Sequence, residues 1–168
     1  MADPLSDTLD RLAATPKRLA HLVVEADDDT LDAAAPGQWS ARTVLAHFRD
    51  VEVLANRLRL ERMLAEAAPV FANFDEDAWA IDRNRSRDQK AQLLGDFALQ
   101  RQASLAIFTG LRPQDWERTG SHPSRGAFTV LSWLDAWLDH DRGHLEQLER
   151  LLRVTVDEVL KRRFHPRA

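Results

Sequence analysis

Cysteine and tyrosine are both absent from this sequence of 168 residues. The lack of cysteine excludes disulfide bonds, thiolate metal sites and a nucleophilic thiol carried by the protein itself. Any thiol chemistry would therefore need a thiol supplied from outside. The 23 basic side chains are scattered among 27 acidic ones, and no Lys/Arg block is long enough to predict a nucleic-acid surface.

Long apolar runs are also missing. No segment approaches the length of a membrane span, and the N-terminal stretch MADPLSDTLDRLAA is acidic and lacks the apolar centre of a signal peptide. The sequence shows no glycine-rich phosphate loop, no nucleophile elbow and no paired-carboxylate signature. These absences predict a cytoplasmic protein that binds neither membranes nor nucleic acids. Its length and its 44% apolar content fit one domain over residues 1–168.

Helical periodicity dominates the sequence, and no segment shows the alternation of a convincing strand. Four long helices and a short fifth are predicted, over residues 5–26, 40–67, 86–108, 129–153 and 155–163. Ser40 fits an N-cap, Ser86 and Gln89 form a capping-box pattern, and Pro16 predicts a kink or restart in the first helix. Two long connectors join the helices, residues 69–85 and 111–127. The pattern predicts an all-α four-helix bundle with long crossover connections and a short C-terminal helix.

Three histidines stand on the predicted buried faces of these helices. The core stripe of the last long helix contains Trp133, Trp137, His140, His144, Leu148 and Leu151. His140 and His144 are one turn apart and project from the same face, so both imidazoles can reach one ion. His47 lies on the second long helix, in a core stripe with Val44, Val51, Leu54 and Leu58.

A shared divalent metal would give all three imidazoles a partner, and three histidine ligands would leave a position for water or substrate. The alternative is that each histidine is a core residue held by a hydrogen bond. Three such residues on core stripes of neighbouring helices favour the metal. Imidazole ligands suit zinc, nickel, iron and manganese, with zinc as the first expectation and nickel as the second. Protonation of imidazoles with an ordinary pKa of about 6.5 would release the ion toward pH 5.

Other polar residues are weaker candidates. Asp50, Asp141 and Asp139 could each orient an imidazole, or each could be a solvated helix charge. Asp50 could alternatively join the metal ligands. His122 could line the mouth of a pocket or serve only in a turn. The remaining histidines, His21 and His165, are expected at the surface, and the catalytic residues stay unknown.

Two segments resemble signatures of the DinB-like superfamily. The first is PGQWSA at 36–41 followed by VLAHFRDVE at 44–52. The second combines GSHP at 120–123, GAFT at 126–129 and LDHDRGHL at 138–145. Order and spacing agree from about residue 5 to residue 152. The resemblance implies a four-helix bundle of up-down-down-up order that holds a divalent metal through His47, His140 and His144.

The resemblance also implies classes of function. DinB-like proteins include thiol-dependent S-transferases, mycothiol-dependent maleylpyruvate isomerase and proposed metal-dependent hydrolases, and many are homodimers. The first hypothesis is therefore a metal-dependent thiol S-transferase or related hydrolase that acts on a small molecule. The transferase would use an external low-molecular-weight thiol. The second hypothesis is a non-catalytic metal- or ligand-binding bundle of a stress response, and a homodimer is expected in both cases.

Overall fold

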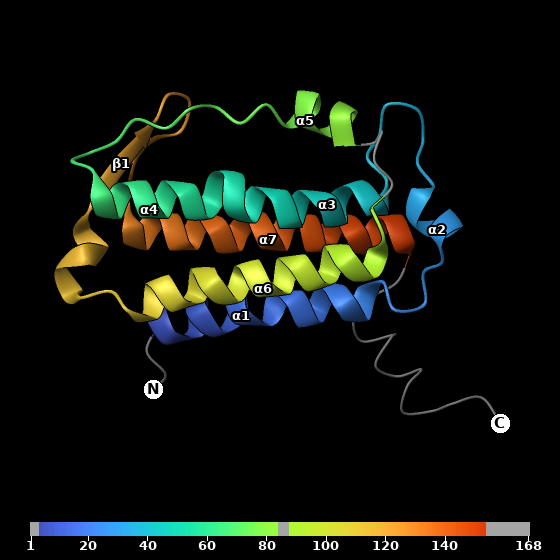
Figure 1. Cartoon of the computed structure of the whole chain (residues 1–168), viewed down its shortest axis with the longest axis horizontal. Helices are drawn as coiled ribbons and strands as arrows, with labels where there is room; N and C mark the ends of the chain where they lie inside the picture. The colour runs from blue at the N-terminus through green and yellow to red at the C-terminus, as the bar shows by residue number, and fades with distance from the viewer. Residues whose placement is uncertain (1–3, 84–87, 154–168) are drawn as a thin grey trace.

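Four long helices lie side by side in the computed structural model, which describes residues 4–83 and 88–153 (Figure 1). They are α1 (Pro4–Leu22), the continuous run α3 (Ala41–Val51), η1 (Glu52–Arg57) and α4 (Leu58–Ala65), then α6 (Lys90–Thr109) and α7 (Val130–Leu152). α1 and α7 run in one direction, α3–α4 and α6 run in the other, and both α1 and α3 pack against α6 and α7. The predicted four-helix bundle and its up-down-down-up order are thus confirmed. No helix within the described ranges is both long enough and apolar enough to cross a lipid bilayer.

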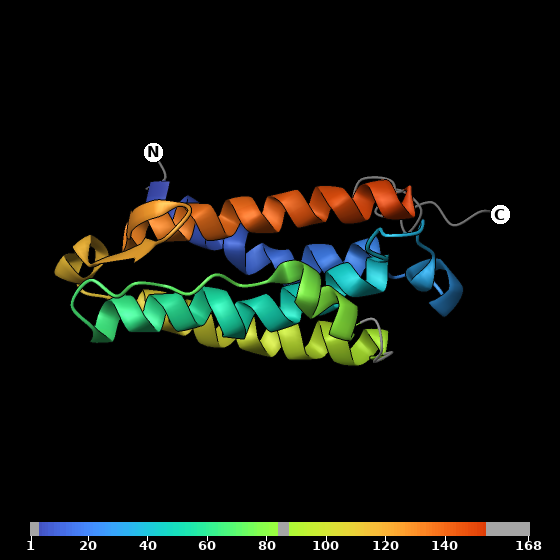
Figure 2. The same ribbon diagram turned by 90° about the horizontal axis from the view of Figure 1, so that it is seen from above.

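A long crossover joins α4 to α6, because these two helices run in the same direction. The chain passes back along the α3–α4 run and forms the short helix α5 (Glu76–Arg83) before α6 begins (Figure 2). Within this connector Phe71 is buried and Trp79 packs against the core. The sequence predicts the connector and its packing on the bundle, but it does not predict the helix α5.

Some of the observed helix boundaries match the predicted ones, and others differ. Ser40 caps α3 and Thr129 caps α7, since each hydroxyl accepts a backbone N–H from the first turn. α1 ends at Leu22, before the predicted end, and it continues through Pro16 without a restart. A short helix that the sequence does not predict, α2 (Asp28–Asp32), follows α1. α6 begins at Lys90 with Gln89 as its N-cap, later than the predicted start at residue 86. Ser86 itself and the predicted fifth helix lie outside the described residues.

The second connector contains a β-hairpin that the sequence does not predict. After the short helix η2 (Pro113–Glu117), β1 (Thr119–His122) pairs antiparallel with β2 (Gly126–Thr129). Strands of four residues are too short to show an alternating pattern. β1 also joins the first connector through two backbone hydrogen bonds. Ser121 N–H donates to the Pro69 carbonyl at 2.9 Å, and the Ser121 carbonyl accepts the N–H of Phe71 at 2.8 Å. The hairpin therefore holds the two connectors together beside α4.

The π-helical segment η1 changes which residues of the second long helix face the core. The predicted stripe holds for Val44, His47 and Val51, which are buried, but Leu54 and Leu58 are 54% and 48% exposed. A π turn inserts an extra residue, which rotates the rest of the helix by about 100°. The downstream positions that are buried instead are Ala55, Asn56, Arg59, Leu60 and Met63. The prediction for the two leucines is wrong for this reason, and the π turn brings polar side chains inward.

Two apolar clusters fill the bundle, and a polar layer lies between them. The cluster near α2 includes Leu19, Phe48, Phe97 and Leu148. The cluster near the hairpin includes Leu12, Met63, Phe108 and Trp137. Between the two clusters each of the four helices contributes a buried polar residue, namely Thr15, Glu52, Arg101 and Asp141. This layer positions the candidate site in the middle of the bundle.

Gly120 in β1 has no room for a side chain, because a Cβ there would collide with the Phe71 ring and lie 3.0 Å from Met63 Cγ. Gly120→Ala should therefore lower the free energy of unfolding by about 1–3 kcal/mol. Gly95 in α6 is a matched control, since a Cβ at that position meets nothing within 4 Å. Gly95→Ala should raise the free energy of unfolding by roughly 0.5–1 kcal/mol. Urea unfolding measures both, and equal effects of one sign would contradict the packing at Gly120.

Candidate metal centre

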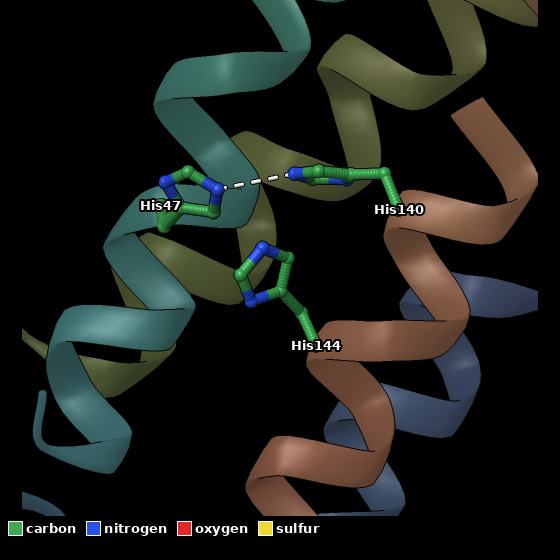
Figure 3. Close-up of side chains that lie close together, drawn as sticks. All are labelled: His47, His140 and His144. Atoms are coloured by element: carbon green, nitrogen blue, oxygen red, sulfur yellow. Dashed lines mark hydrogen bonds between the residues drawn. The ribbon is translucent and has the colours of Figure 1, made fainter. Parts of the chain in front are cut away.

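Three imidazoles from two helices meet in the middle of the bundle (Figure 3). His47 on α3 is fully buried, and His140 and His144 on α7 are partly buried. One ring nitrogen of each residue lies within 4.8 Å of the other two. The Nε2 atoms of His47 and His140 are 3.1 Å apart. These three side chains form the histidine cluster, in which the structure places the three residues that the sequence singled out as metal ligands.

The geometry of the histidine cluster fits a shared divalent ion. With metal–nitrogen distances of about 2.0–2.1 Å, two imidazole nitrogens on one ion lie about 2.9–3.4 Å apart. The separation of 3.1 Å between His47 and His140 falls in this range. An N–H···N hydrogen bond has a similar length, and in either case the Nδ1 atoms of both residues stay buried without a hydrogen-bond partner among the described residues. A single hydrogen bond between His47 and His140 does not account for the third imidazole, whereas one ion gives a ligand position to all three rings.

Burial keeps two of the imidazoles neutral, which is the form that binds a metal. Burial, followed by the proximity of His140 and His144, lowers the pKa of His47 to about 2. Burial and then His140 lower the pKa of His144 to about 4, against the opposing effects of Gln147 and Asp141. Both values lie far below the ordinary value of about 6.5 that the expected release near pH 5 assumes. Protons therefore compete with a metal at these two ligands only in more acidic solution.

Metal-free protein should lose stability as the pH falls from 7 to 5. His47 and His144 stay neutral in the folded protein, whereas in the unfolded chain they bind protons below about pH 6.5. The unfolded state then binds more protons, so each histidine lowers the free energy of unfolding by up to about 1.4 kcal/mol per pH unit in this window. Urea unfolding of chelator-treated protein at several pH values measures the slope. His144→Gln should show a shallower slope, and an unchanged slope would contradict the lowered pKa of His144.

Polar side chains lie beside two of the rings, and one of them fixes its ring by a hydrogen bond. His144 Nδ1 lies 2.8 Å from the acceptor Gln147 Oε1, so Nδ1 carries the hydrogen and Nε2 keeps a free lone pair for a metal. His140 Nδ1 lies 3.5 Å from Asp141 Oδ1, which is longer than a normal hydrogen bond. The structure therefore places Asp141 beside His140, as expected for a carboxylate that supports a ligand.

Arg101, Glu52 and Asp141 form a buried ion cluster in the polar layer, with each side chain 1% exposed. The Arg101 guanidinium donates to both carboxylate oxygens of Glu52 at 3.0 and 2.9 Å and to both of Asp141 at 2.6 and 3.1 Å. It also donates to the Leu12 carbonyl at 2.8 Å, and Trp137 Nε1 donates to Glu52 at 3.2 Å. Although burial alone would raise it, the pKa of Asp141 is lowered to about 2, chiefly by the Arg101 charge. The guanidinium thereby fixes an ionised Asp141 next to the histidine cluster.

Asp50 has a different role from the one predicted. Its carboxylate accepts hydrogen bonds from Arg49 Nε at 2.7 Å and from Trp79 Nε1 at 3.0 Å. It does not pair with His47 Nδ1, because that atom has no partner among the described residues. The side chain leaves α3 toward α5 and holds Trp79 there. The rings of Trp79 and Trp39 lie 5.2 and 4.9 Å from the His47 ring, so Asp50 supports an aromatic cover over the cluster.

The remaining candidates lie outside the histidine cluster. His122 is buried in β1, accepts Ser124 N–H through Nδ1 at 3.3 Å, and lines a cavity together with His140. It thus has both a place in the hairpin turn and a place in a cavity wall. Asp139 is an exposed helix charge that pairs with the arginine three residues further along. His21 is only partly buried in the last turn of α1, and the last histidine of the chain lies outside the described residues.

Most of the chain matches a known family, because the sequence profile of the DinB superfamily covers residues 11–148. The chain belongs to the DinB superfamily. The uncharacterized protein YuaE of Bacillus subtilis is 25% identical to it over 128 residues, which are 68% of this chain and 77% of YuaE. Among solved structures, YfiT from Bacillus subtilis is similar with a TM-score of 0.80 and 21% identity over 92% of each chain. YfiT is described as a probable metal-dependent hydrolase with an unusual four-helix bundle topology.

Sequence reasoning misses several side chains that support this DinB-type site. Gln147 follows His144 by three residues, a spacing that places two side chains on one helix face, so a signal for it exists. Arg101 interrupts an apolar stripe on α6 that contains Leu93, Phe97 and Phe108, and a charge in such a stripe indicates a buried partner. Glu52 leaves no comparable signal, since the π turn decides which way it faces.

Proposed function

We propose that this DinB-superfamily protein is a divalent-metal-dependent hydrolase that acts on a small molecule at the histidine cluster. The observation that carries the proposal is that His140 belongs both to the cluster and to the wall of a cavity of about 410 Å³. Three imidazoles leave a coordination position free, as in catalytic sites, whereas structural zinc sites use four protein ligands. Among the described residues no fourth histidine or carboxylate joins the three. The combination of an incomplete ligand set and an adjacent space favours catalysis.

Each side chain around the site has a definite part in this proposal. His47, His140 and His144 would hold the ion, and Gln147 fixes the hydrogen of His144 on Nδ1. A divalent ion at this position supplies Lewis-acid activation of water at neutral pH. The rings of Trp39 and Trp79 pack against His47 and reduce the access of bulk water to it, and Asp141 keeps negative charge next to His140.

The description of YfiT as a probable metal-dependent hydrolase supports hydrolysis as the reaction class. The donor set supports a borderline metal, because neutral imidazole suits zinc and nickel better than it suits calcium or magnesium. We therefore take zinc as the first choice and nickel as the second, with iron and manganese also compatible.

Thiol S-transfer is the second candidate function. The chain has no cysteine, so it holds no thiol of its own that would compete for the ion or for an electrophile. An external low-molecular-weight thiol that reached the ion would be deprotonated there and become nucleophilic at neutral pH. The same cavity would then admit the electrophile.

Zinc-loaded protein should hydrolyse members of a panel of small esters and amides faster than free zinc does, and a chelator should abolish the activity. His140→Ala should reduce the rate to that of free zinc, because it removes a ligand that borders the cavity. His21→Ala is the matched control and should keep the wild-type rate. The same preparation, incubated with electrophiles and common bacterial thiols, tests S-transfer.

No acceleration over free zinc in either assay would contradict an enzymatic role. The remaining function would then be a non-catalytic metal- or ligand-binding bundle. Water proton relaxation on the manganese-loaded protein separates the two, since an exchangeable coordinated water favours an enzyme and a full protein ligand set does not. The homodimer and the cytoplasmic location stay predictions of the sequence.

A further inference from the structure

The cavity beside His140 has a polar inner wall that the proposed hydrolysis does not use. It is lined by residues of the second long helix, the first connector, the β-hairpin and α7. Its buried lining includes Asn56, Arg59, His122 and Trp133. Its mouth carries exposed charged residues, namely Asp75, Glu76 and Arg125. The π turn is the reason that the first two of these buried residues face inward.

Arg59 places a positive charge in this wall, and no carboxylate of the described residues lies within ion-pair distance of it. The residue is 9% exposed, and its one hydrogen bond to a described residue runs from Nη2 to the Ala72 carbonyl at 3.1 Å. Its guanidinium carbon lies 5.3 Å from the centroid of the Trp133 ring. Burial, and then the charge of Arg125, lower the pKa of Arg59, while the more distant Glu76 charge acts in the opposite direction. A buried guanidinium that no described carboxylate contacts is costly, which indicates that an anion completes the site.

Two further donors line the same cavity. Asn56 is 5% exposed, and its side-chain amide forms no hydrogen bond within the part of the chain that the structure describes. His122 Nδ1 accepts the backbone N–H of Ser124, so the ring hydrogen is on Nε2 and available to donate. Burial and the charges of Arg59 and Arg125 lower the pKa of His122, so the ring stays neutral. A guanidinium, an amide and an imidazole N–H together complement a carboxylate.

We propose that this cavity binds the carboxylate group of the substrate through Arg59, Asn56 and His122, and that His140 at its edge places the scissile bond beside the metal. The inference rests on the proposed function and narrows it to small carboxylic acids. A single negative charge matches the single buried cation. A dianion such as a phosphate monoester fits less well, since Asp75 and Glu76 at the mouth would repel it.

Benzoate and benzamide are matched probes, because they share size and shape and differ in charge. Tryptophan fluorescence titration of the zinc-loaded protein should show benzoate binding at least about tenfold more tightly than benzamide, the value of one charge-assisted hydrogen bond. Arg59→Met should remove this preference, and Arg59→Lys should keep part of it. Arg112→Met is the control, since Arg112 is a largely exposed arginine outside the cavity lining. If Arg59→Met does not fold, Asn56→Leu should weaken benzoate binding by about threefold and leave benzamide binding unchanged.

The same titration on chelator-treated protein separates this inference from the proposed function. A benzoate preference that persists without zinc and disappears in Arg59→Met supports the carboxylate site even if no hydrolysis is found. If the benzoate preference is lost when zinc is removed but is retained in zinc-loaded Arg59→Met, the carboxylate binds the metal and the proposal is overturned. Equal binding of benzoate and benzamide, or tighter binding of phenyl phosphate than of benzoate, would also overturn it.

Discussion

Arg101→Met should lower the free energy of unfolding by about 3–5 kcal/mol, because it leaves two buried carboxylates without their counterion. Glu52, Asp141 and Arg101 are each 1% exposed, so solvent cannot replace the lost partner. The substitution also removes the hydrogen bond to the Leu12 carbonyl. Urea unfolding of metal-free protein measures the effect without a contribution from bound ion.

Arg142→Met is the matched control for Arg101→Met. Arg142 neighbours Asp141 in sequence, but its side chain is 57% exposed and, among the described residues, its ion pair is with exposed Asp139. Its loss should change stability by less than about 0.5 kcal/mol. Combining Arg101→Met with Glu52→Gln and Asp141→Asn should cost less than Arg101→Met alone, because no unpaired charge is left. A loss within 1 kcal/mol for Arg101→Met alone would show that the carboxylates are not dependent on the guanidinium.

His140→Ala should weaken zinc binding by more than about a hundredfold, because removal of a direct ligand exceeds the 10–100-fold that loss of a supporting residue causes. His47→Ala should have a similar effect, although His47 lies on a different helix, since its Nε2 is 3.1 Å from that of His140. Titration against a chromophoric chelator measures the affinities.

Two controls separate the ligands from their surroundings. Gln147→Leu should weaken zinc binding by only about tenfold, since it removes the acceptor for His144 Nδ1 and leaves all three imidazoles in place. His122→Ala should leave zinc binding unchanged, because His122 lines the cavity and is outside the histidine cluster. Loss of zinc binding in His122→Ala, or its retention in His140→Ala, would contradict the ligand set.

The histidine pair on α7 could be predicted because α7 is a regular α-helix throughout, so its buried positions recur at constant spacing. Trp133, Trp137 and Leu148 are buried as the stripe requires, and only the last member, Leu151, is 37% exposed. His47 could be predicted because it precedes the π turn. The stripe fails immediately afterwards, at Leu54, since no local composition marks where a helix takes an extra residue per turn.

The supporting parts of the site could be predicted less well, because they depend on pairing between distant segments. The buried ion cluster joins residues from three helices. In the sequence alone, each of these charged residues would be expected at the protein surface. The hairpin is fixed by hydrogen bonds to the first connector, which four-residue strands do not reveal. The cavity requires both the π turn and the hairpin, so the residues Asn56 and Arg59 gain a role only once the fold is known.

X-ray absorption spectroscopy of protein loaded with one equivalent of zinc is the most direct test of the three-histidine metal centre. We expect one tightly held ion per chain, bound by three imidazole nitrogens and at least one further light-atom ligand that exchanges with solvent. His140→Ala loaded under the same conditions should lose this spectrum. If the folded wild-type protein takes up no divalent ion, or holds one without imidazole ligands, then the metal centre does not exist and the three histidines are core residues.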